Sequence, residues 1–258
     1  MRCTILNATR GKATLFSSFR RWLKKRHAAN TESVRTPPEP EDDDLVWFHP
    51  PCDVHNHTVW DSYWQDQVTH GLTPPLFDMF CHDDPLIECL IMRGAKTLLC
   101  AGSGISQEPR ALAAAGFEVI AMDLSPRAMH LAETWQFSPM ELDRFFSKEL
   151  RATGGTVRFV SGDILDCSVC PGPFDAIIER RMLQLFPSEE RGIALDMLAS
   201  RLRSDGLFLS HCHDGRWRPP GKPVHQVEKF FRDRGWTIRF CETANQVGRV
   251  AWLQMSTG

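Results

Sequence analysis

The sequence predicts a doubly wound α/β sandwich with a mostly parallel, seven-stranded sheet that ends in an antiparallel C-terminal hairpin. The pattern becomes globular from residue 46, and from Thr97 strands and helices alternate, which is the order that builds a parallel sheet covered by helices on both faces. Gly102 lets the chain turn sharply between the first strand and the next helix, and Gly104 has no Cβ to block a ligand from the backbone. The last two strand patterns have no helix between them and therefore predict a hairpin at the sheet edge.

The elements are expected in a simple order. Two helices come first, at Trp60–His70 and at about Leu76–Arg93, separated by the break Thr73-Pro-Pro75. The parallel strands are short apolar runs: Thr97–Ala101, Val119–Asp123, Val157–Ser161, Phe174–Glu179 and Gly206–His211. Helices are expected between and after them: Glu108–Ala115, Pro126–Trp135, Ser138–Arg151, Ser188–Arg201 and Val224–Arg234. The hairpin strands are Thr237–Glu242 and Val250–Met255.

Local signals mark the ends of several helices. Ser125 is the expected N-cap of the helix that begins at Pro126, because proline is favoured at the first helical position. Ser188 is expected to cap the helix at Ser188–Arg201, since acidic residues follow it. Gly154-Gly155 is expected to end the helix before the third strand.

Composition indicates one globular domain with a separate N-terminal tail. A hydrophobic content of 42% and a charged content of 24% are ordinary for a soluble globular protein. Residues 1–31 are basic and free of acid, and residues 32–45 are rich in proline and acid, so neither stretch is expected to form a core. We therefore divide the chain into a disordered tail and linker at 1–45 and one domain at 46–258. Alternatively, the basic tail is an organelle-targeting peptide or binds anionic lipid.

Charge and cysteine content limit the partners and the compartment. The net charge of −2 gives no general reason to bind nucleic acid. The nine cysteines are an odd number and several lie in apolar runs, which indicates reduced thiols and a cytoplasmic location. No apolar run approaches the roughly 20 residues that span a membrane. We expect a cytoplasmic monomer with no nucleic-acid partner and no transmembrane segment.

The glycine turn and the acids that follow it predict a cofactor that contains a ribose. Asp123 ends the second strand, where a carboxylate can hold the two ribose hydroxyls. Glu108 stands four residues after Gly104, at a helix start, where a carboxylate repels phosphate but suits an ammonium group. The chain also lacks a phosphate-binding Gly-Lys-Ser/Thr run. This combination points away from NAD and ATP and toward S-adenosyl-L-methionine, which has no phosphate.

Two further features agree with that cofactor. Asp163 and Ile164 follow the third strand, and a carboxylate beside an apolar side chain suits the amine and the ring of adenine. Trp60 and Trp64 stand one helical turn apart ahead of the sheet, where they can cover a cofactor. Each has a structural alternative: Asp163 and Asp175 as turn or cap residues, and the two tryptophans as core.

The arrangement resembles the class I S-adenosylmethionine-dependent methyltransferases, which have a Rossmann-like fold, and within them the thiopurine S-methyltransferase family. The resemblance covers about Trp60–Glu242. It rests on a Trp-x-x-x-Trp pair, a Gly-x-Ser-x-Glu run, an acid after the second strand, a Phe-Asp-x-Ile-x-acid-Arg segment and a Pro-Pro-Gly-x-Pro stretch. These motifs lie at Trp60 and Trp64; Gly104, Ser106 and Glu108; Asp123; Phe174–Arg180; and Pro219–Pro223.

The resemblance implies a set of site residues. Those that would line the cofactor are Trp60, Trp64, Gly102, Asp123, Asp163, Ile164 and Arg180. Their neighbours Ser103, Gly104, Glu108 and Leu124 complete the predicted cofactor contacts. Arg180, near the methionine end and the substrate, and Glu179 are the predicted catalytic residues. The chain departs from the family pattern where Cys100 replaces an acid, Glu179 an aspartate and Arg181 a small residue.

The resemblance also implies an activity. We expect an enzyme that transfers a methyl group from S-adenosyl-L-methionine to a small-molecule methyl acceptor, at sulfur or another soft nucleophile. Thiolates form near neutral pH and need little help from a base. Methylation of a metabolite at nitrogen or oxygen is the alternative within the fold. A non-catalytic regulatory protein that binds the cofactor is the alternative from another class.

No metal site is predicted. Cys167-Ser-Val-Cys170 is a single Cys-x-x-Cys pair, which would need His211 and His213 brought close to complete a zinc site. Those two histidines otherwise face substrate or are polar loop residues. The stretch His55-Asn-His57 is more simply a solvated loop before the first helix.

Overall fold

The computed structural model describes residues 53–70, 85–136, 154–212, 225–244 and 248–255. All of them belong to the second of two compact units, Met1–His49 and Pro50–Gly258. The predicted tail and linker at 1–45, the predicted helix at Ser138–Arg151 and the stretch Pro219–Pro223 lie outside the described residues.

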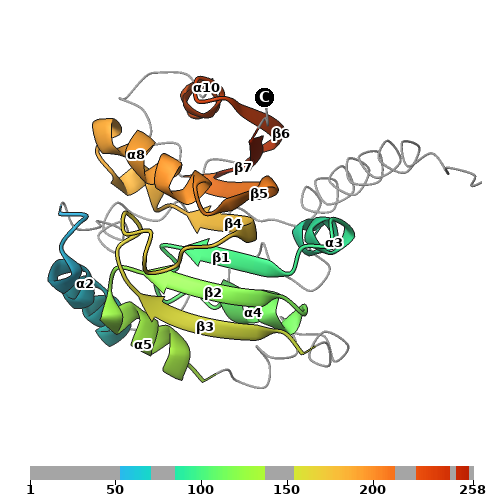
Figure 1. Ribbon diagram of the computed structural model, residues 1–258. Coiled ribbons are helices and arrows are strands. Elements are labelled where there is room, and N and C mark those ends of the chain that lie inside the picture. Colours follow the sequence, from blue (N-terminus) through green and yellow to red (C-terminus); the bar gives the residue numbers. More distant parts are fainter. Residues whose placement is uncertain (1–52, 71–84, 137–153, 213–224, 245–247, 256–258) are drawn as a thin grey trace, which may run out of the picture. The chain divides into compact units, whose positions relative to one another are not determined.

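A sheet of seven strands runs through the described part of the chain (Figure 1). The strands are β1 (Thr97–Ala101), β2 (Glu118–Asp123), β3 (Thr156–Ser161), β4 (Phe174–Arg180), β5 (Leu202–Cys212), β6 (Trp236–Ala244) and β7 (Gly248–Met255). Their order is β3-β2-β1-β4-β5-β7-β6. The pairs from β3 through β5 are parallel, and β7 is antiparallel to both β5 and β6. The predicted α/β class with a parallel sheet is confirmed.

The helices lie close to their predicted positions, although residues 76–84 of the helix predicted at Leu76–Arg93 lie outside the described residues. They are α2 (His57–Thr69), α3 (Pro85–Met92), α4 (Glu108–Ala114), α5 (Pro126–Thr134), the 3₁₀ turn η2 (Leu183–Leu185), α8 (Ser188–Ala199) and α10 (His225–Arg232). Sequence patterns found the longer helices because apolar spacing and caps are local features. The turn η2 was not predicted. In the described part of the chain, no helix has the length and apolar character that a membrane span requires.

The two serine caps had different outcomes. The Ser125 side chain accepts a hydrogen bond from the Ala128 N–H at 2.9 Å, as an N-cap should. Ser188 is instead the first residue of α8, after Pro187 in the N-cap position, and its hydroxyl bonds to Glu189. The prediction for Ser188 was therefore wrong by one residue, because Pro187 has the extended backbone that precedes a helix.

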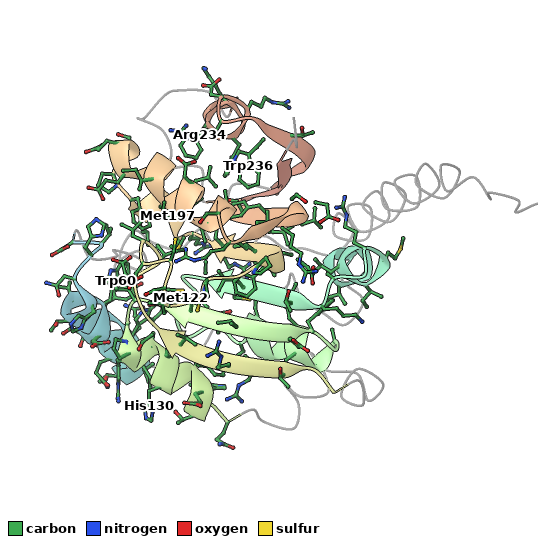
Figure 2. All side chains as sticks on the ribbon, in the orientation of Figure 1. Trp60, Met122, His130, Met197, Arg234 and Trp236 are labelled. Atoms are coloured by element: carbon green, nitrogen blue, oxygen red, sulfur yellow. The ribbon has the colours of Figure 1, made fainter. Side chains whose placement is uncertain are left out.

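Strand side chains alternate between two apolar cores. Leu98 and Cys100 of β1 belong to the core that α3 and α4 cover, whereas Leu99 and Ala101 belong to the core under α8 and α10. Trp236 closes the second core, with its ring 5.3 Å from Phe208 and edge-on to Phe231 (Figure 2). Phe231 and Trp236 are therefore core residues.

The strand order places the candidate site. From β1 the chain goes first to β2 and β3 on one side and then to β4 and β5 on the other. At such a reversal the connections diverge and leave a crevice at the carboxyl ends of the two central strands. Figure 1 shows α2 lying at this end of the sheet, beside α5.

Candidate active site

The glycine turn after β1 is held by two large side chains. Gly102 and Gly104 have φ values of 62° and 51°, which a glycine adopts without strain. A Cβ on Gly102 would lie 2.6 Å from the Met182 side chain, and one on Gly104 would lie 2.5 Å from the Trp64 ring. The sequence assigned the space at Gly104 to a ligand. That assignment needs correcting, because the indole of Trp64 occupies the space that the missing Cβ leaves.

Asp123 lies where a ribose-binding acid is expected, at the end of β2. Its carboxylate accepts the Gly104 N–H at 2.8 Å and the Ser125 N–H at 3.0 Å. Burial raises the pKa of Asp123, the two N–H donors oppose the rise, and the nearby charge of Asp61 adds to it. Each carboxylate oxygen accepts one of these N–H groups, so each oxygen can still accept a second hydrogen bond from a hydroxyl group. Leu124, next in the chain, is partly buried.

Glu108 and Arg180 form a buried ion pair. The Arg180 guanidinium donates to the Glu108 carboxylate, and the two side chains are 9% and 6% exposed. Glu108 is the first residue of α4, and Arg180 ends β4. The sequence treated them as two separate contacts, one for an ammonium group and one for an acceptor. The fold brings them together because a buried carboxylate needs a partner charge.

Glu179 shapes the turn that follows β4. One carboxylate oxygen accepts the N–H groups of Met182 and Leu183 at 3.1 and 3.2 Å, and the other accepts the Ser210 hydroxyl. The residue is 1% exposed, and burial raises the pKa of its carboxyl to about 7. Arg181, between the acid and the amides it binds, has a φ of 58°. These contacts are structural ones, and the catalytic role predicted for Glu179 stays a prediction.

Helix α2 is joined to the start of α5 by Asp61 and by Gln65, whose side-chain oxygen accepts a hydrogen bond from the Arg127 guanidinium. Asp61 accepts the Ser125 hydroxyl and, at 2.9 Å, the Arg127 N–H. This anchor holds α2 where Trp64 covers the glycine turn. The Trp64 Nε1 is buried without a hydrogen-bond partner among the described residues. No sequence signal pointed to Asp61, since its partners are more than sixty residues away.

Trp60 belongs to the same helix but is satisfied within the protein. It is 8% exposed, and its Nε1 donates to the Val54 carbonyl at 3.2 Å. Figure 2 shows it on α2, at the end of the sheet that also carries Met122. The structure therefore supports the core alternative for Trp60 and leaves Trp64 as the indole that faces the turn.

The predicted adenine contacts, Asp163 and Ile164, lie in the loop that follows β3. Asp163 Oδ1 accepts the Leu165 N–H at 2.8 Å, so this acid has the turn role of the structural alternative. Ile164 is buried, and its carbonyl accepts a hydrogen bond from the buried Arg201 at 2.7 Å. These two hydrogen bonds hold the loop in place, and within the described residues Asp163 Oδ2 makes no hydrogen bond.

Asp175 lies away from the candidate site, at the amino end of β4. It accepts the N–H groups of Lys96 and Thr97 at 2.7 and 2.9 Å and pairs with Arg203. It therefore joins the starts of β1 and β4, a structural role that differs from the turn or cap position expected as its alternative.

No group of His, Cys, Asp and Glu side chains within the described ranges is arranged to hold a metal. Cys167 and Cys170 are free thiols, and Cys167 contacts Met197 and Ser200. His55 binds Glu190 on α8 at 2.6 Å, so it is a surface contact. His213 lies outside the described residues.

The donor set fits S-adenosyl-L-methionine. The hydroxyl of Ser103 and the Nε1 of Trp64 are buried polar atoms without partners in the described part of the chain, which a bound ligand would satisfy. Asp123 can accept hydrogen bonds from the two hydroxyl groups of a ribose. The adjacent opposite charges of Glu108 and Arg180 are complementary to the ammonium and carboxylate of an amino acid.

Comparison with known proteins agrees with this arrangement. The model of the thiopurine S-methyltransferase family matches residues 55–250. The fold is similar to that of magnesium protoporphyrin IX methyltransferase from Synechocystis PCC 6803, crystallised with bound S-adenosylmethionine, at 19% identity and a TM-score of 0.54 over 78% of this chain and 95% of that one.

A second similar structure is a TehB-like S-adenosylmethionine-dependent methyltransferase from Corynebacterium glutamicum, at 18% identity and a TM-score of 0.51 over 78% of this chain and 98% of that one. Among curated protein sequences there is no match.

Proposed function

The chain belongs to the thiopurine S-methyltransferase family, and we propose that it methylates a small molecule at sulfur or another soft nucleophile. It is an S-adenosyl-L-methionine-dependent methyltransferase. When bound, the cofactor supplies a methyl group on a positively charged sulfur, which a nucleophile displaces in line. The part that the protein plays is to bind, to orient and to exclude water.

We assign the cofactor contacts by position around the strand ends. Asp123 binds the ribose, with Leu124 beside it, while Asp163 and Ile164 contact adenine. Glu108 and Arg180 bind the ammonium and carboxylate of the methionine part. The turn residues Gly102, Ser103 and Gly104 form the base, and Trp64 covers the site from α2, while Trp60 packs in the core beside it.

The buried pair of Glu108 and Arg180 is the observation that carries this proposal. It lies between the glycine turn and the end of β4, and its two charges are nearly excluded from water. Electrostatic attraction is strong in such a place because the surroundings screen it weakly. Arg180 is thereby held beside the position where an acceptor approaches, and it can stabilise an acceptor that carries negative charge.

Among the described residues no base is poised beside the candidate site, which favours a sulfur acceptor over a nitrogen or oxygen acceptor. Hydroxyl and ammonium acceptors must lose a proton before or during attack, whereas a thiol is already partly ionised near neutral pH. Glu179 has a pKa of about 7, which suits a base, but both of its oxygens are bound to neighbouring groups and the residue is buried. A thiolate needs no such base.

Transfer of label from methyl-labelled S-adenosyl-L-methionine to a panel of thiols, amines and alcohols tests the proposal. We expect transfer to thiols and little to the others. Binding of S-adenosylhomocysteine is measured by calorimetry on the same preparation. Binding without transfer to any acceptor would favour the regulatory alternative. Transfer mainly to amines or alcohols would contradict the sulfur assignment.

A further inference from the structure

The turn that follows β4 is bound by a charged side chain on each of two sides. From within the strand, the Glu179 carboxylate accepts the N–H groups of Met182 and Leu183. From α8, the Arg191 guanidinium donates to the carbonyl groups of Leu183 and Phe186, each at 3.0 Å. The acid therefore holds N–H groups of the turn, and the arginine holds its carbonyl groups.

Arg191 supplies donors that a short 3₁₀ turn cannot supply by itself. The last carbonyl groups of a helical turn have no N–H partner within the turn. Leu183, Gln184 and Phe186 are all buried, so an unpaired carbonyl group among them would be costly. A guanidinium carries five N–H donors in a fixed plane, and the Gln184 carbonyl is also within its reach, at 3.4 Å. One arginine thus holds the whole turn in one conformation.

The turn places Met182 against the glycine turn that follows β1. A Cβ on Gly102 would lie 2.6 Å from the Cβ and Cγ of Met182 and 2.7 Å from its Sδ. Three successive atoms of the Met182 side chain therefore lie close to the backbone of Gly102. Met182 is 8% exposed, and its N–H is one of the two groups that Glu179 binds. A displacement of the turn after β4 would move this side chain away from the glycine turn.

We propose that Arg191 is a positioning residue for cofactor binding. Its hydrogen bonds to the turn after β4 keep Met182 packed on Gly102, and this packing keeps the glycine turn in the conformation that receives the cofactor. Arg191 thereby acts through Met182. This inference rests on the proposed function, in which Gly102, Ser103 and Gly104 form the base of the cofactor site.

A double-mutant cycle between Arg191 and Met182 tests the proposal. Affinity for S-adenosylhomocysteine is measured by calorimetry for the wild type, Arg191→Leu, Met182→Ala and the double variant. If Arg191 acts through Met182, its replacement has little further effect once that side chain has been shortened. We expect each single variant to bind about tenfold more weakly than the wild type, and the double variant to stay within about twofold of the weaker single variant. Independent effects would instead multiply to a loss of about a hundredfold.

The same titrations separate positioning from folding. The stoichiometry reports the fraction of molecules that can bind, whereas the dissociation constant describes the molecules that do bind. A purely structural role would lower the urea midpoint of Arg191→Leu and leave its dissociation constant unchanged. Arg234→Leu is the matched control, because Arg234 is exposed and its guanidinium also donates to a main-chain carbonyl, that of Phe230 at 3.3 Å. Its dissociation constant should stay within about twofold of the wild-type value.

A second substitution keeps the charge at position 191. Burial raises the pKa of Glu179 to about 7, and the charge of Arg191 is among the influences that oppose the rise. Arg191→Lys retains this charge but loses the planar fork, so it should weaken S-adenosylhomocysteine binding less than Arg191→Leu does. The cycle is repeated with this variant, and its loss should again disappear in the Met182→Ala background. The lysine variant also provides the test if Arg191→Leu does not fold.

The possible outcomes are distinct. Unchanged affinity in the folded Arg191 variants, losses that multiply in the double variants, or an equal loss in Arg234→Leu overturns the positioning role. Failure of the wild type to bind S-adenosylhomocysteine overturns the proposed cofactor contacts and this inference with them. Normal binding by the wild type without methyl transfer to any acceptor overturns the proposed function alone.

Discussion

The buried carboxyl of Glu179 makes a quantitative prediction about stability. Its pKa is about 7 in the folded protein, against 4.5 for an exposed glutamate, chiefly because burial disfavours the charge. Between these two pH values the folded state holds a proton that the unfolded state has released. Stability therefore falls as the pH rises through that window, by up to about 1.4 kcal/mol per pH unit.

Glu179→Gln removes this dependence, because glutamine stays neutral and still accepts the N–H groups of Met182 and Leu183. The shift corresponds to about 3.4 kcal/mol in total, of which about 2.5 kcal/mol appears between pH 5 and pH 8. The variant should thus gain about 2.5 kcal/mol relative to the wild type over that range. The two proteins share all their other titratable groups, histidines included. The effects of those groups on stability therefore cancel when the variant is compared with the wild type at each pH.

Urea denaturation at several pH values measures this difference directly. Glu118→Gln, at an exposed glutamate on β2, controls for the loss of a surface charge. A difference between Glu179→Gln and wild type that stays constant with pH would refute the reasoning. So would a difference of the opposite sign, with the variant losing stability as the pH rises.

Three other predictions concern the cofactor side of the site. Asp123→Ala should weaken S-adenosylhomocysteine binding about tenfold or more, because the ribose loses a charged acceptor; undiminished affinity by calorimetry would contradict its role. The control for the glycine turn is Gly94→Ala, where a Cβ meets nothing and the expected cost of about 1–2 kcal/mol comes from backbone strain alone. Gly104→Ala should cost at least about 1 kcal/mol more in urea denaturation, since its Cβ strikes an indole on α2. Asp61→Ala should lower both the urea midpoint and S-adenosylhomocysteine affinity, with exposed Asp66→Ala on the same helix as its control; equal behaviour of the two would exclude the anchoring role.

Much of the fold was predictable because its signals are local. The apolar run at β1 and the proline after Ser125 each specify an element within a few residues. The acids at strand ends were found in the same way, since a parallel sheet places its carboxyl ends at one edge. Asp123 therefore lies next to the glycine turn, as predicted.

The pairing of side chains was not predictable in this way. Glu108 and Arg180 are seventy-two residues apart and had been given separate roles. The sequence did not indicate that Asp61 anchors α2, because acidic residues are common on the exposed faces of helices. The positive φ of Arg181 also has no sequence signal, because it accompanies the hydrogen bonds that Glu179 accepts from Met182 and Leu183.

The amino-acid sequence by itself determined which residues stand at the ends of which strands, and hence the class of cofactor that those ends suit. Periodicity, caps and glycine turns act over a few residues, so they can be read without coordinates. Only the tertiary structure decided which charges neutralise one another and which side chains fill the space beside Gly102 and Gly104. Those outcomes depend on burial and close packing between distant segments, and these exist only once the chain has folded.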